Sequence, residues 1–279
     1  MEKVLRTISD FPHQTLAFVF DVDGTMIQKY VDGTEVPSLI SILRNENILN
    51  DVYTEKAKDL KNMYHSLEIN PELSYEEKSI KMEEWWQKHK DLLIEHKLTK
   101  NHIHQAVNHP SILLRDGVKE IFDYAHKYAI PVIIFSASGI GIDSITYLLE
   151  RFNLQSSNVH IVTNRFEYEG VLLTKSIPPL IHTLNKNESV LIFFPEIKQI
   201  LLSRENVILF GDLPHDADMV DNKNHKNVIR VGLLNEQDLE KKNKFLPLFH
   251  EKFDIVIEDD GSLENILESF QENASSFSN

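Results

Sequence analysis

The sequence predicts an α/β fold with a Rossmann-like, doubly wound parallel sheet and a helical segment inserted after the first strand. Six apolar runs rich in β-formers are mostly separated by helix-length segments, which is typical of strands that helices cover on both faces. The first run ends directly at Asp21, and the fourth is followed by Gly211 and Asp212. The block from about residue 28 to residue 111 differs from the rest, because it consists of long, charged, amphipathic stretches.

The first predicted strand, Leu16–Phe20 (L-A-F-V-F), is apolar throughout, which is typical of a strand buried on both faces. Pro131 is tolerated in the second because it stands near the strand start. The remaining predicted strands share this apolar, β-rich character and are Ile130–Phe135, Val159–Val162, Val207–Phe210, Val228–Val231 and Phe253–Ile257.

The block between residues 28 and 111 predicts helices, and we expect no strand in it. Turn signals at Asp32-Gly33 and His109-Pro110 stand near its two ends. We therefore predict a helical cap domain at residues 28–111, placed over the strand ends of a catalytic core made of residues 1–27 and 112–279.

Composition limits the class of partner. The 279 residues are 42% apolar and 26% charged, close to the averages of soluble globular proteins. A formal net charge of −14 repels nucleic-acid backbones and anionic lipids, so we expect neither as a partner. The absence of cysteine excludes disulfides and thiol nucleophiles. With no apolar stretch of membrane-spanning length and no secretory signal, we expect a cytoplasmic monomer.

Two carboxylates follow the first predicted strand in D-V-D-G-T. Asp21 and Asp23 are separated by one residue, so both can face the crevice beyond the carboxyl edge of a parallel sheet. Gly24 allows a tight turn out of the strand. The alternative interpretation is a solvated acidic turn.

A second acidic cluster, G-D-L-P-H-D-A-D, follows the strand predicted at Val207–Phe210. If this strand neighbours the first, Asp21 and Asp212 converge on a hard cation, and Mg²⁺ prefers carboxylate oxygens. A solvated turn or a calcium loop are the alternatives, but the D-x-D-x-D-G spacing of such calcium loops is absent.

Two further features suit a phosphate group. Ser136 and Ala137 open the loop S-A-S-G after a predicted strand, where hydroxyl and backbone N–H donors can face phosphate oxygens. An ordinary strand-to-helix turn is the alternative. Lys186 stands in H-T-L-N-K-N near a predicted helix end, where a lysine is usually solvated.

In this order, D-V-D-G-T, F-S-A-S, Lys186 and G-D-L-P-H-D resemble the motifs of the haloacid-dehalogenase-like phosphotransferases. The chain is further similar to the cytosolic 5′-nucleotidase III (pyrimidine 5′-nucleotidase) family, through L-E-I-N-P-E-L-S-Y-E-E-K, M-E-E-W-W-Q-K and P-L-I-H-T-L-N-K. The resemblance extends from about Leu16 to Leu267. One departure is S-A-S-G, which has one residue more than the S-A-G of the family.

The resemblance implies a hydrolase that cleaves nucleoside 5′-monophosphates (UMP and CMP, 7-methyl-GMP, or both) through an aspartyl-phosphate. Asp21 would attack the phosphorus, and Asp23 would act as general acid and then as general base. The resemblance also implies a Mg²⁺ ion held by Asp21, by the backbone carbonyl of Asp23 and by Asp212. Asp216 would orient metal-bound water or Lys186.

The same matching assigns substrate contacts. Lys186, Ser136 and the backbone around Ala137 would stabilise charge on the phosphate oxygens.

In the cap, Glu68 would accept hydrogen bonds from the base, and Trp85 or Trp86 would stack on it. Adjacent helical residues face different ways, so the alternative is one tryptophan in the core and one on the surface. His89 replaces a serine that relatives carry near the base pocket.

Two other functions stay open at this point. One is a haloacid-dehalogenase-like phosphatase of a small phosphate that is not a nucleotide. The other is a catalytically silent metal-binding module, and the joint presence of Asp21, Asp23, Lys186 and Asp212 argues against it.

Overall fold

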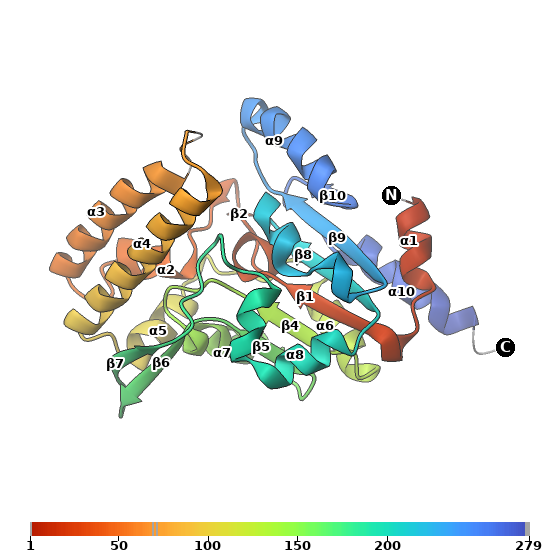
Figure 1. Cartoon of the computed structure of the whole chain (residues 1–279), viewed down its shortest axis with the longest axis horizontal. Coiled ribbons are helices and arrows are strands. Elements are labelled where there is room, and N and C mark those ends of the chain that lie inside the picture. Colours follow the sequence, from red (N-terminus) through yellow and green to blue (C-terminus); the bar gives the residue numbers. More distant parts are fainter. Residues whose placement is uncertain (1, 69, 71, 277–279) are drawn as a thin grey trace.

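The computed structural model describes residues 2–68, 70 and 72–276, and a six-stranded parallel sheet lies at its centre (Figure 1). The strand order is β10-β9-β8-β1-β4-β5, and each neighbouring pair is parallel. The strands are β1 (Leu16–Phe20), β4 (Val132–Phe135), β5 (Val159–Val162), β8 (Asn206–Gly211), β9 (Asn227–Leu234) and β10 (Ile255–Glu258). All six predicted strands are confirmed, with small differences at their ends.

Helices cover both faces of the sheet, as a doubly wound fold requires. Phe18 and Phe20 of β1 enter one hydrophobic cluster, and Ala17 and Val19 enter a second one on the opposite face. The first cluster includes residues of α1 (Glu2–Ser9), α6 (Val118–Lys127), α7 (Ile142–Arg151) and α10 (Glu264–Ser276), and it continues into the helices inserted after β1. The helices that pack into the second cluster are α8 (Pro195–Leu202) and α9 (Leu239–Lys252).

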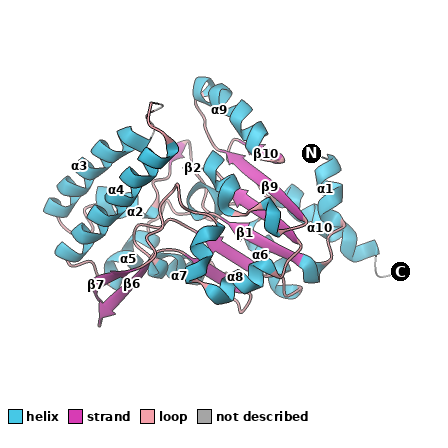
Figure 2. Cartoon of the chain, in the orientation of Figure 1, coloured by secondary structure: helices cyan, strands magenta, loops and turns pink. Residues whose placement is uncertain are grey.

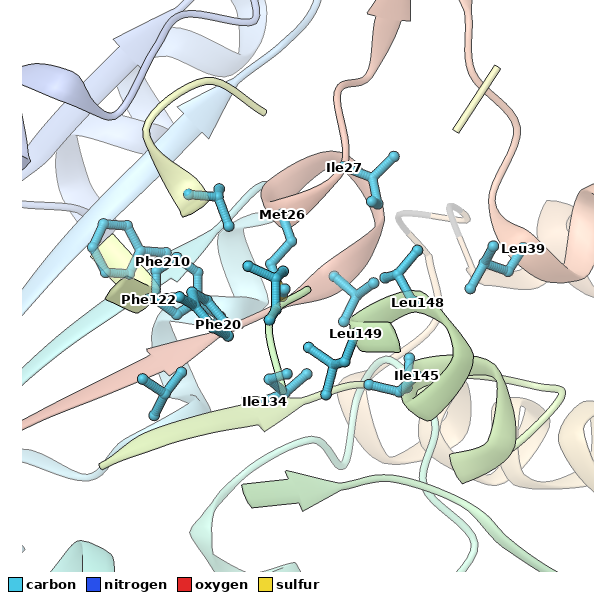
Figure 3. Packing of buried hydrophobic residues seen from close by; sticks show 14 of the residues in the cluster. Phe20, Met26, Ile27, Leu39, Phe122, Ile134, Ile145, Leu148, Leu149 and Phe210 are labelled. Carbon is cyan, nitrogen blue, oxygen red and sulfur yellow. The ribbon is translucent and has the colours of Figure 1, made fainter. Parts of the chain in front are cut away.

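Aromatic packing fixes the end of β1. The ring of Phe20 stacks on that of Phe210 of β8, with centroids 4.2 Å apart. Phe122 of α6 contacts the ring of Phe20, and Figure 3 shows the three phenyl rings beside Met26 and Ile134. The next residue after Phe20 is Asp21, so this packing gives the first acidic motif a rigid base.

The segment after β1 is helical, and in Figures 1 and 2 its helices α2, α3 and α4 lie beside the sheet. Its helices are α2 (Leu39–Asn45), α3 (Asp51–Glu68), α4 (Tyr75–Glu95) and α5 (Lys100–Val107). Helix α4 begins at a capping box, in which Ser74 accepts from the backbone N–H of Glu77 and the Glu77 carboxylate accepts from that of Ser74. Short helical turns complete the chain at His13–Thr15, Val22–Met26, Glu188–Phe193, Pro214–Met219 and Asn222–Asn224.

The expectation that no strand lies between residues 28 and 111 is wrong. A hairpin of β2 (Tyr30–Val31) and β3 (Thr34–Glu35) turns at Asp32 and Gly33, whose φ angles are 50° and 73°. A second hairpin outside the sheet, β6 (Arg165–Glu169) with β7 (Leu172–Ile177), was also not predicted. Both hairpins carry mixed polar sequences, so apolar runs do not reveal them.

Among the residues that the structure describes, no helix combines the length and the apolar character needed to cross a bilayer.

Candidate active site

The carboxylates of Asp21, Asp212 and Asp216 meet at the carboxyl edge of the sheet. Strands β1 and β8 are direct neighbours in the register Phe20↔Phe210, and the backbone N–H of Asp21 donates to the carbonyl of Phe210 at 3.0 Å. One carboxylate oxygen from each aspartate lies within 4.8 Å of the others. The structure therefore brings Asp21 and Asp212 together, as the two strand ends predicted.

Gly24 lets the chain turn beside these carboxylates. Its φ is 75°, a region that side chains with a Cβ rarely adopt. A Cβ at this position would lie 2.3 Å from the Oδ2 atom of Asp212. In the same turn, Asp23 accepts a hydrogen bond from the backbone N–H of Leu39 at 3.3 Å, which joins it to the first turn of α2.

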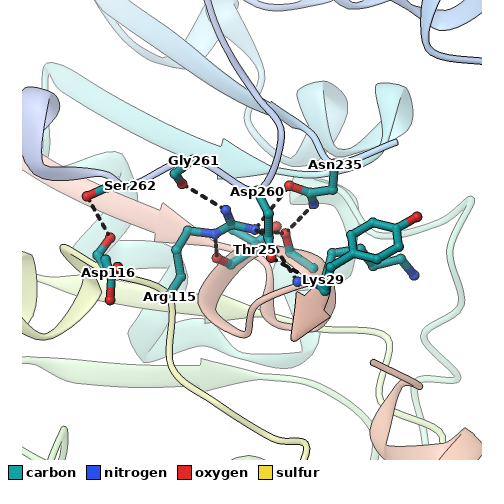
Figure 4. A network of polar contacts seen from close by, with 10 residues as sticks. Thr25, Lys29, Arg115, Asp116, Asn235, Asp260, Gly261 and Ser262 are labelled. Carbon is teal, nitrogen blue, oxygen red and sulfur yellow. Dashed lines mark hydrogen bonds and ion pairs between the residues drawn. The ribbon is translucent and has the colours of Figure 1, made fainter. Parts of the chain in front are cut away.

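The buried Arg115 side chain holds this turn through several polar contacts (Figure 4). Its side chain is 1% exposed and donates to the carbonyls of Gly24 and Thr25, both at 2.7 Å. It also forms an ion pair with Asp260 at 2.6 Å and donates to the side chain of Asn235 at 3.1 Å. This network fixes the backbone that carries Asp21 and Asp23.

Lys186 is buried and paired with two of the acidic residues. Its Nζ atom lies 2.5 Å from Asp21 and 2.6 Å from Asp216. The prediction of a helix end at Lys186 is wrong, because the residue stands in a loop between β7 and the turn that starts at Glu188. Asn185 binds the backbone of Leu180 and His182 with its side chain, which competes with helix formation.

Asp216 uses both of its oxygens within the protein. Oδ1 pairs with Lys186, and Oδ2 accepts from the backbone N–H groups of Asp212 and Leu213 at 3.1 and 2.9 Å. Its side chain is fully buried. Asp216 therefore positions Lys186 and the loop that carries Asp212.

The local charge balance favours a bound cation. Burial raises the pKa of Asp21 to about 7, although the Lys186 ammonium lowers it. Burial and the charge of Asp21 raise the pKa of Asp212 well above its ordinary value. The carboxylates of Asp21, Asp212 and Asp216 share the Lys186 ammonium, and Lys29, which also acts on Asp212, is already paired with Glu35. The site therefore carries excess negative charge, and its oxygen donors suit a hard metal ion.

The loop after β4 forms the next part of the site. Ser136 is buried, and its hydroxyl accepts from the backbone N–H of Ser138 at 3.2 Å. The Ser138 hydroxyl lies 2.9 Å from that of Ser144 in α7, so it belongs to the loop's own support. Trp86 of α4 donates to the carbonyl of Ala137 at 3.2 Å, which connects this loop to the inserted helices.

A cavity of about 300 Å³ opens above these groups, between the edge of the sheet and the inserted helices. Eight of the nine predicted site residues line it; Asp216 is the exception and lies beneath the wall. Those eight are Asp21, Asp23, Glu68, His89, Ser136, Ala137, Lys186 and Asp212.

The far wall of the cavity is aromatic and polar. Trp85 and Trp86 both line it and both are half-buried, so neither is the core or surface residue that the alternative interpretation required. Trp85 stacks on Tyr64, with centroids 6.0 Å apart. Glu68, at the end of α3, accepts from the Thr183 hydroxyl at 2.9 Å. Burial lowers the pKa of His89 to about 3, so this imidazole is neutral.

Several lining residues were missed from the sequence: Ser38, Ser41, Arg44, Thr183 and His215. The clearest available signal was Arg44, the only charged residue of the otherwise apolar and polar helix L-I-S-I-L-R-N. The others are ordinary polar residues whose part in the cavity depends on how distant segments pack.

Comparison with known proteins places the chain among nucleotidases. The family model described as pyrimidine 5′-nucleotidase (UMPH-1) matches residues 24–271. The 7-methylguanosine phosphate-specific 5′-nucleotidase of Gallus gallus is 35% identical over 263 residues, which are 94% of this chain and 89% of that protein. The Homo sapiens protein of the same name is 33% identical over 251 residues, covering 89% and 81%. These relatives are named for the hydrolysis of a phosphoric monoester.

Solved structures agree. Cytosolic 5′-nucleotidase IIIB, bound to cytidine, superposes with a TM-score of 0.84 at 27% identity, covering 99% of this chain and 92% of that one. A probable phosphoserine phosphatase from Vibrio cholerae has a TM-score of 0.56 at 13% identity and shares the haloacid-dehalogenase-like fold. Family model, relatives and fold lead to one conclusion: the chain belongs to the pyrimidine 5′-nucleotidase (UMPH-1) family.

Proposed function

We propose that this protein is a Mg²⁺-dependent 5′-nucleotidase that releases phosphate from nucleoside 5′-monophosphates. One observation carries the proposal: a single cavity is lined both by the Asp21, Lys186 and Asp212 group and by Trp85 and Glu68 of the inserted helices. The first group suits a phosphate bound with a metal ion, and the second suits a planar base. Relatives named for nucleotide hydrolysis support the same activity.

In the proposed reaction, the Asp21 carboxylate attacks the phosphorus and forms an aspartyl-phosphate, which water then hydrolyses. Mg²⁺, held by Asp21, the backbone carbonyl of Asp23 and Asp212, would supply the positive charge that lets carboxylate and phosphate approach. We do not count Asp216 among the ligands, because Lys186 and two backbone N–H groups already use its oxygens.

Asp23 would protonate the leaving ribose oxygen and later accept a proton from the attacking water. Burial raises the pKa of Asp23, which favours the protonated form that a general acid needs, while the hydrogen bond from Leu39 acts in the opposite direction. Lys186, the Ser136 hydroxyl and the backbone at Ala137 would bind the phosphate oxygens. All three line the same cavity as Asp21, and Lys186 is paired with it.

We further propose that residues 28–111 act as a cap domain over a core of residues 1–27 and 112–279. Two hydrogen bonds support this assignment of cap and core. The backbone N–H of Leu39 donates to Asp23, and the indole of Trp86 donates to the carbonyl of Ala137, so each joins an inserted helix to a loop of the proposed site. Glu68, His89 and a tryptophan of the cap would contact the base.

We place the protein in the cytoplasm, because a similar structure is named cytosolic. We also propose that it acts as a monomer, since the carboxylates of Asp21, Asp212 and Asp216 and the Lys186 ammonium assemble within one chain.

The proposal is tested by phosphate release from CMP, UMP, AMP, GMP and 7-methyl-GMP, each with Mg²⁺ and with a chelator. 4-Nitrophenyl phosphate serves as a substrate without a base. Metal-dependent release from one or more nucleotides, faster than from the aryl phosphate, is the expected result. Release from the aryl phosphate alone would indicate a phosphatase of another small phosphate, and no release from any compound would indicate a silent module.

A further inference from the structure

Arg44 places a buried positive charge in the wall of the cavity. Its side chain belongs to α2 and is 4% exposed. One guanidinium nitrogen, Nη2, donates to the Ser41 hydroxyl at 2.8 Å, while the buried Nε atom has no hydrogen-bond partner. Within residues 2–68, 70 and 72–276, no carboxylate forms an ion pair with Arg44. A buried cation without a counter-charge is costly, so a ligand that supplies an acceptor there gains from it.

The position of Arg44 along α2 assigns it to the nucleoside end of the cavity. The backbone N–H of Leu39, at the start of this helix, contacts the proposed general acid Asp23. Arg44 follows five residues later, and at 1.5 Å per residue this places its backbone about 7.5 Å further along the helix axis. The charge of Arg44 also acts on His89, a proposed base contact, which assigns the guanidinium to the nucleoside end of the cavity.

The other ionisable residues at this end of the cavity add little to the charge of Arg44 and neutralise little of it. Lys61 is exposed, so water screens it, and His89 is neutral. Glu68 supplies one negative charge, which already binds the Thr183 hydroxyl and the ring of His65. Among the described residues that line this end of the cavity, Arg44 is the buried cation, and its charge acts in a poorly solvated wall. Lys90 is also buried, but it does not line the cavity, and its Nζ atom donates to Asn164 at 2.8 Å.

We propose that Arg44 makes the cavity select neutral bases with a carbonyl oxygen and reject positively charged bases such as N7-methylated guanine. This inference rests on the proposed nucleotidase function and names its substrate class more closely. A carbonyl oxygen accepts a charge-assisted hydrogen bond from the guanidinium. Methylation of N7 puts a positive charge on the guanine ring, and like charges across a binding site favour discrimination.

GMP and 7-methyl-GMP form the sharpest pair of substrates, because they differ by one methyl group and its charge. Trp85, Trp86 and Glu68 all attract a cationic ring, so Arg44 opposes them. In R44Q this opposition is gone, and we expect the ratio of kcat/KM for 7-methyl-GMP to that for GMP to rise at least about tenfold. R44M is a second neutral variant that suits an apolar wall.

Two variants control for shape and for exposure. R44K keeps the charge, and its ratio is expected to stay within about threefold of the unmodified protein. Lys61→Gln removes an exposed charge from the same cavity and is expected to change the ratio less than twofold. An unchanged or lower ratio in both R44Q and R44M overturns the inference, as does an R44K variant that behaves like R44Q.

Failure of the nucleotidase proposal itself looks different. In that case the protein hydrolyses 4-nitrophenyl phosphate but neither GMP nor 7-methyl-GMP. Charge selection is then measured as calorimetric affinity of D21N and of D21N with R44Q for the two nucleotides. A preference for GMP that R44Q removes supports the role of Arg44, whereas equal affinities, or no binding, overturn it.

Discussion

Gly24 lies so close to Asp212 that a Cβ on the glycine would stand 2.3 Å from the carboxylate oxygen Oδ2. The glycine turn after β1 and the acidic loop after β8 therefore fit together, although almost the whole length of the core separates them in sequence. A residue with a Cβ at this position would meet two obstacles: the overlap with Asp212, and a φ of 75° that residues other than glycine rarely adopt. The contact makes the shape of one acidic motif depend on the other.

We predict that G24A lowers kcat/KM by about 100-fold or more. The added Cβ would force the Asp212 carboxylate away from those of Asp21 and Asp216, and a small misplacement of a catalytic group costs much of the rate. The matched control is G33A, in the β2–β3 hairpin. Gly33 has a similar φ of 73° but nothing within 4 Å of its added Cβ. G33A should cost about 1 kcal/mol of stability and keep most of the activity. Phosphate release and urea denaturation measure both variants, and equal activity losses would refute the steric argument.

Replacing the proposed nucleophile gives a second prediction. D21N should reduce turnover by a factor of about 10⁴ or more while the protein stays folded, because the amide keeps the volume but cannot attack phosphorus. D218N, which changes an exposed aspartate two residues beyond Asp216, is the control and should retain activity. Substantial phosphate release by D21N would contradict the aspartyl-phosphate mechanism.

The sheet and its acidic edge could be predicted because their signals are local. Strands β1 and β8 contain the continuous apolar runs Leu16–Phe20 and Val207–Phe210; Asp21 follows the first directly, and Asp212 follows the second after Gly211. In a parallel sheet all carboxyl ends lie at one edge, so two acidic strand ends meet there if their strands are neighbours. The rule therefore predicts where the two acidic strand ends lie from the sequence alone.

The remaining features depend on packing between distant segments. Arg44 and Thr183 reach the cavity from a helix and a loop whose positions no local pattern specifies. The β2–β3 hairpin is set by the left-handed backbone at Asp32 and Gly33 and not by core burial. Lys186 is surrounded by polar residues in the sequence, yet the fold buries it between Asp21 and Asp216.

A third prediction concerns the base. E68Q should lower kcat/KM for the preferred nucleotide at least about tenfold more than for 4-nitrophenyl phosphate, because a hydrogen bond to a charged group contributes about 1.5 to 3 kcal/mol. E55Q, on an exposed position of the same helix, is the control. Equal losses on both substrates would mean that Glu68 supports the cap through Thr183 instead of reading the base.

The Arg115 network gives a prediction for stability. R115M removes the ion-pair partner of Asp260 and the Arg115 donor to the Thr25 carbonyl, while the Gly24 carbonyl keeps the Asn235 side chain as a donor. We therefore expect a loss of about 3 to 5 kcal/mol in unfolding free energy, because the Asp260 charge is left without its buried counter-charge. R115K keeps the charge but not the planar fork, and it should restore only part of that loss. Urea denaturation measures both, and equal stability of R115K and the unmodified protein would show that charge alone suffices.

The buried Lys90 makes the free energy of unfolding depend on pH, and a single substitution can remove this contribution. Its side chain is 1% exposed, its Nζ atom donates to Asn164 at 2.8 Å, and burial lowers its pKa to about 7. An unfolded lysine keeps its proton up to a pH of about 10.4. Between these values the unfolded chain binds more protons than the folded one, so the contribution of Lys90 to stability rises as the pH increases from 7 to 10.

K90M should remove this contribution while keeping the buried volume. Asn164 still accepts from the backbone N–H of Ile181, so the substitution leaves no unpaired oxygen. We expect K90M to be more stable than the unmodified protein at pH 7, with a difference that shrinks towards pH 10 by about 1.4 kcal/mol for each pKa unit. Urea denaturation at pH 7, 8.5 and 10 measures the difference. A gap that stays constant with pH would show that Lys90 keeps its proton in the folded protein, held by Asn164 despite its burial.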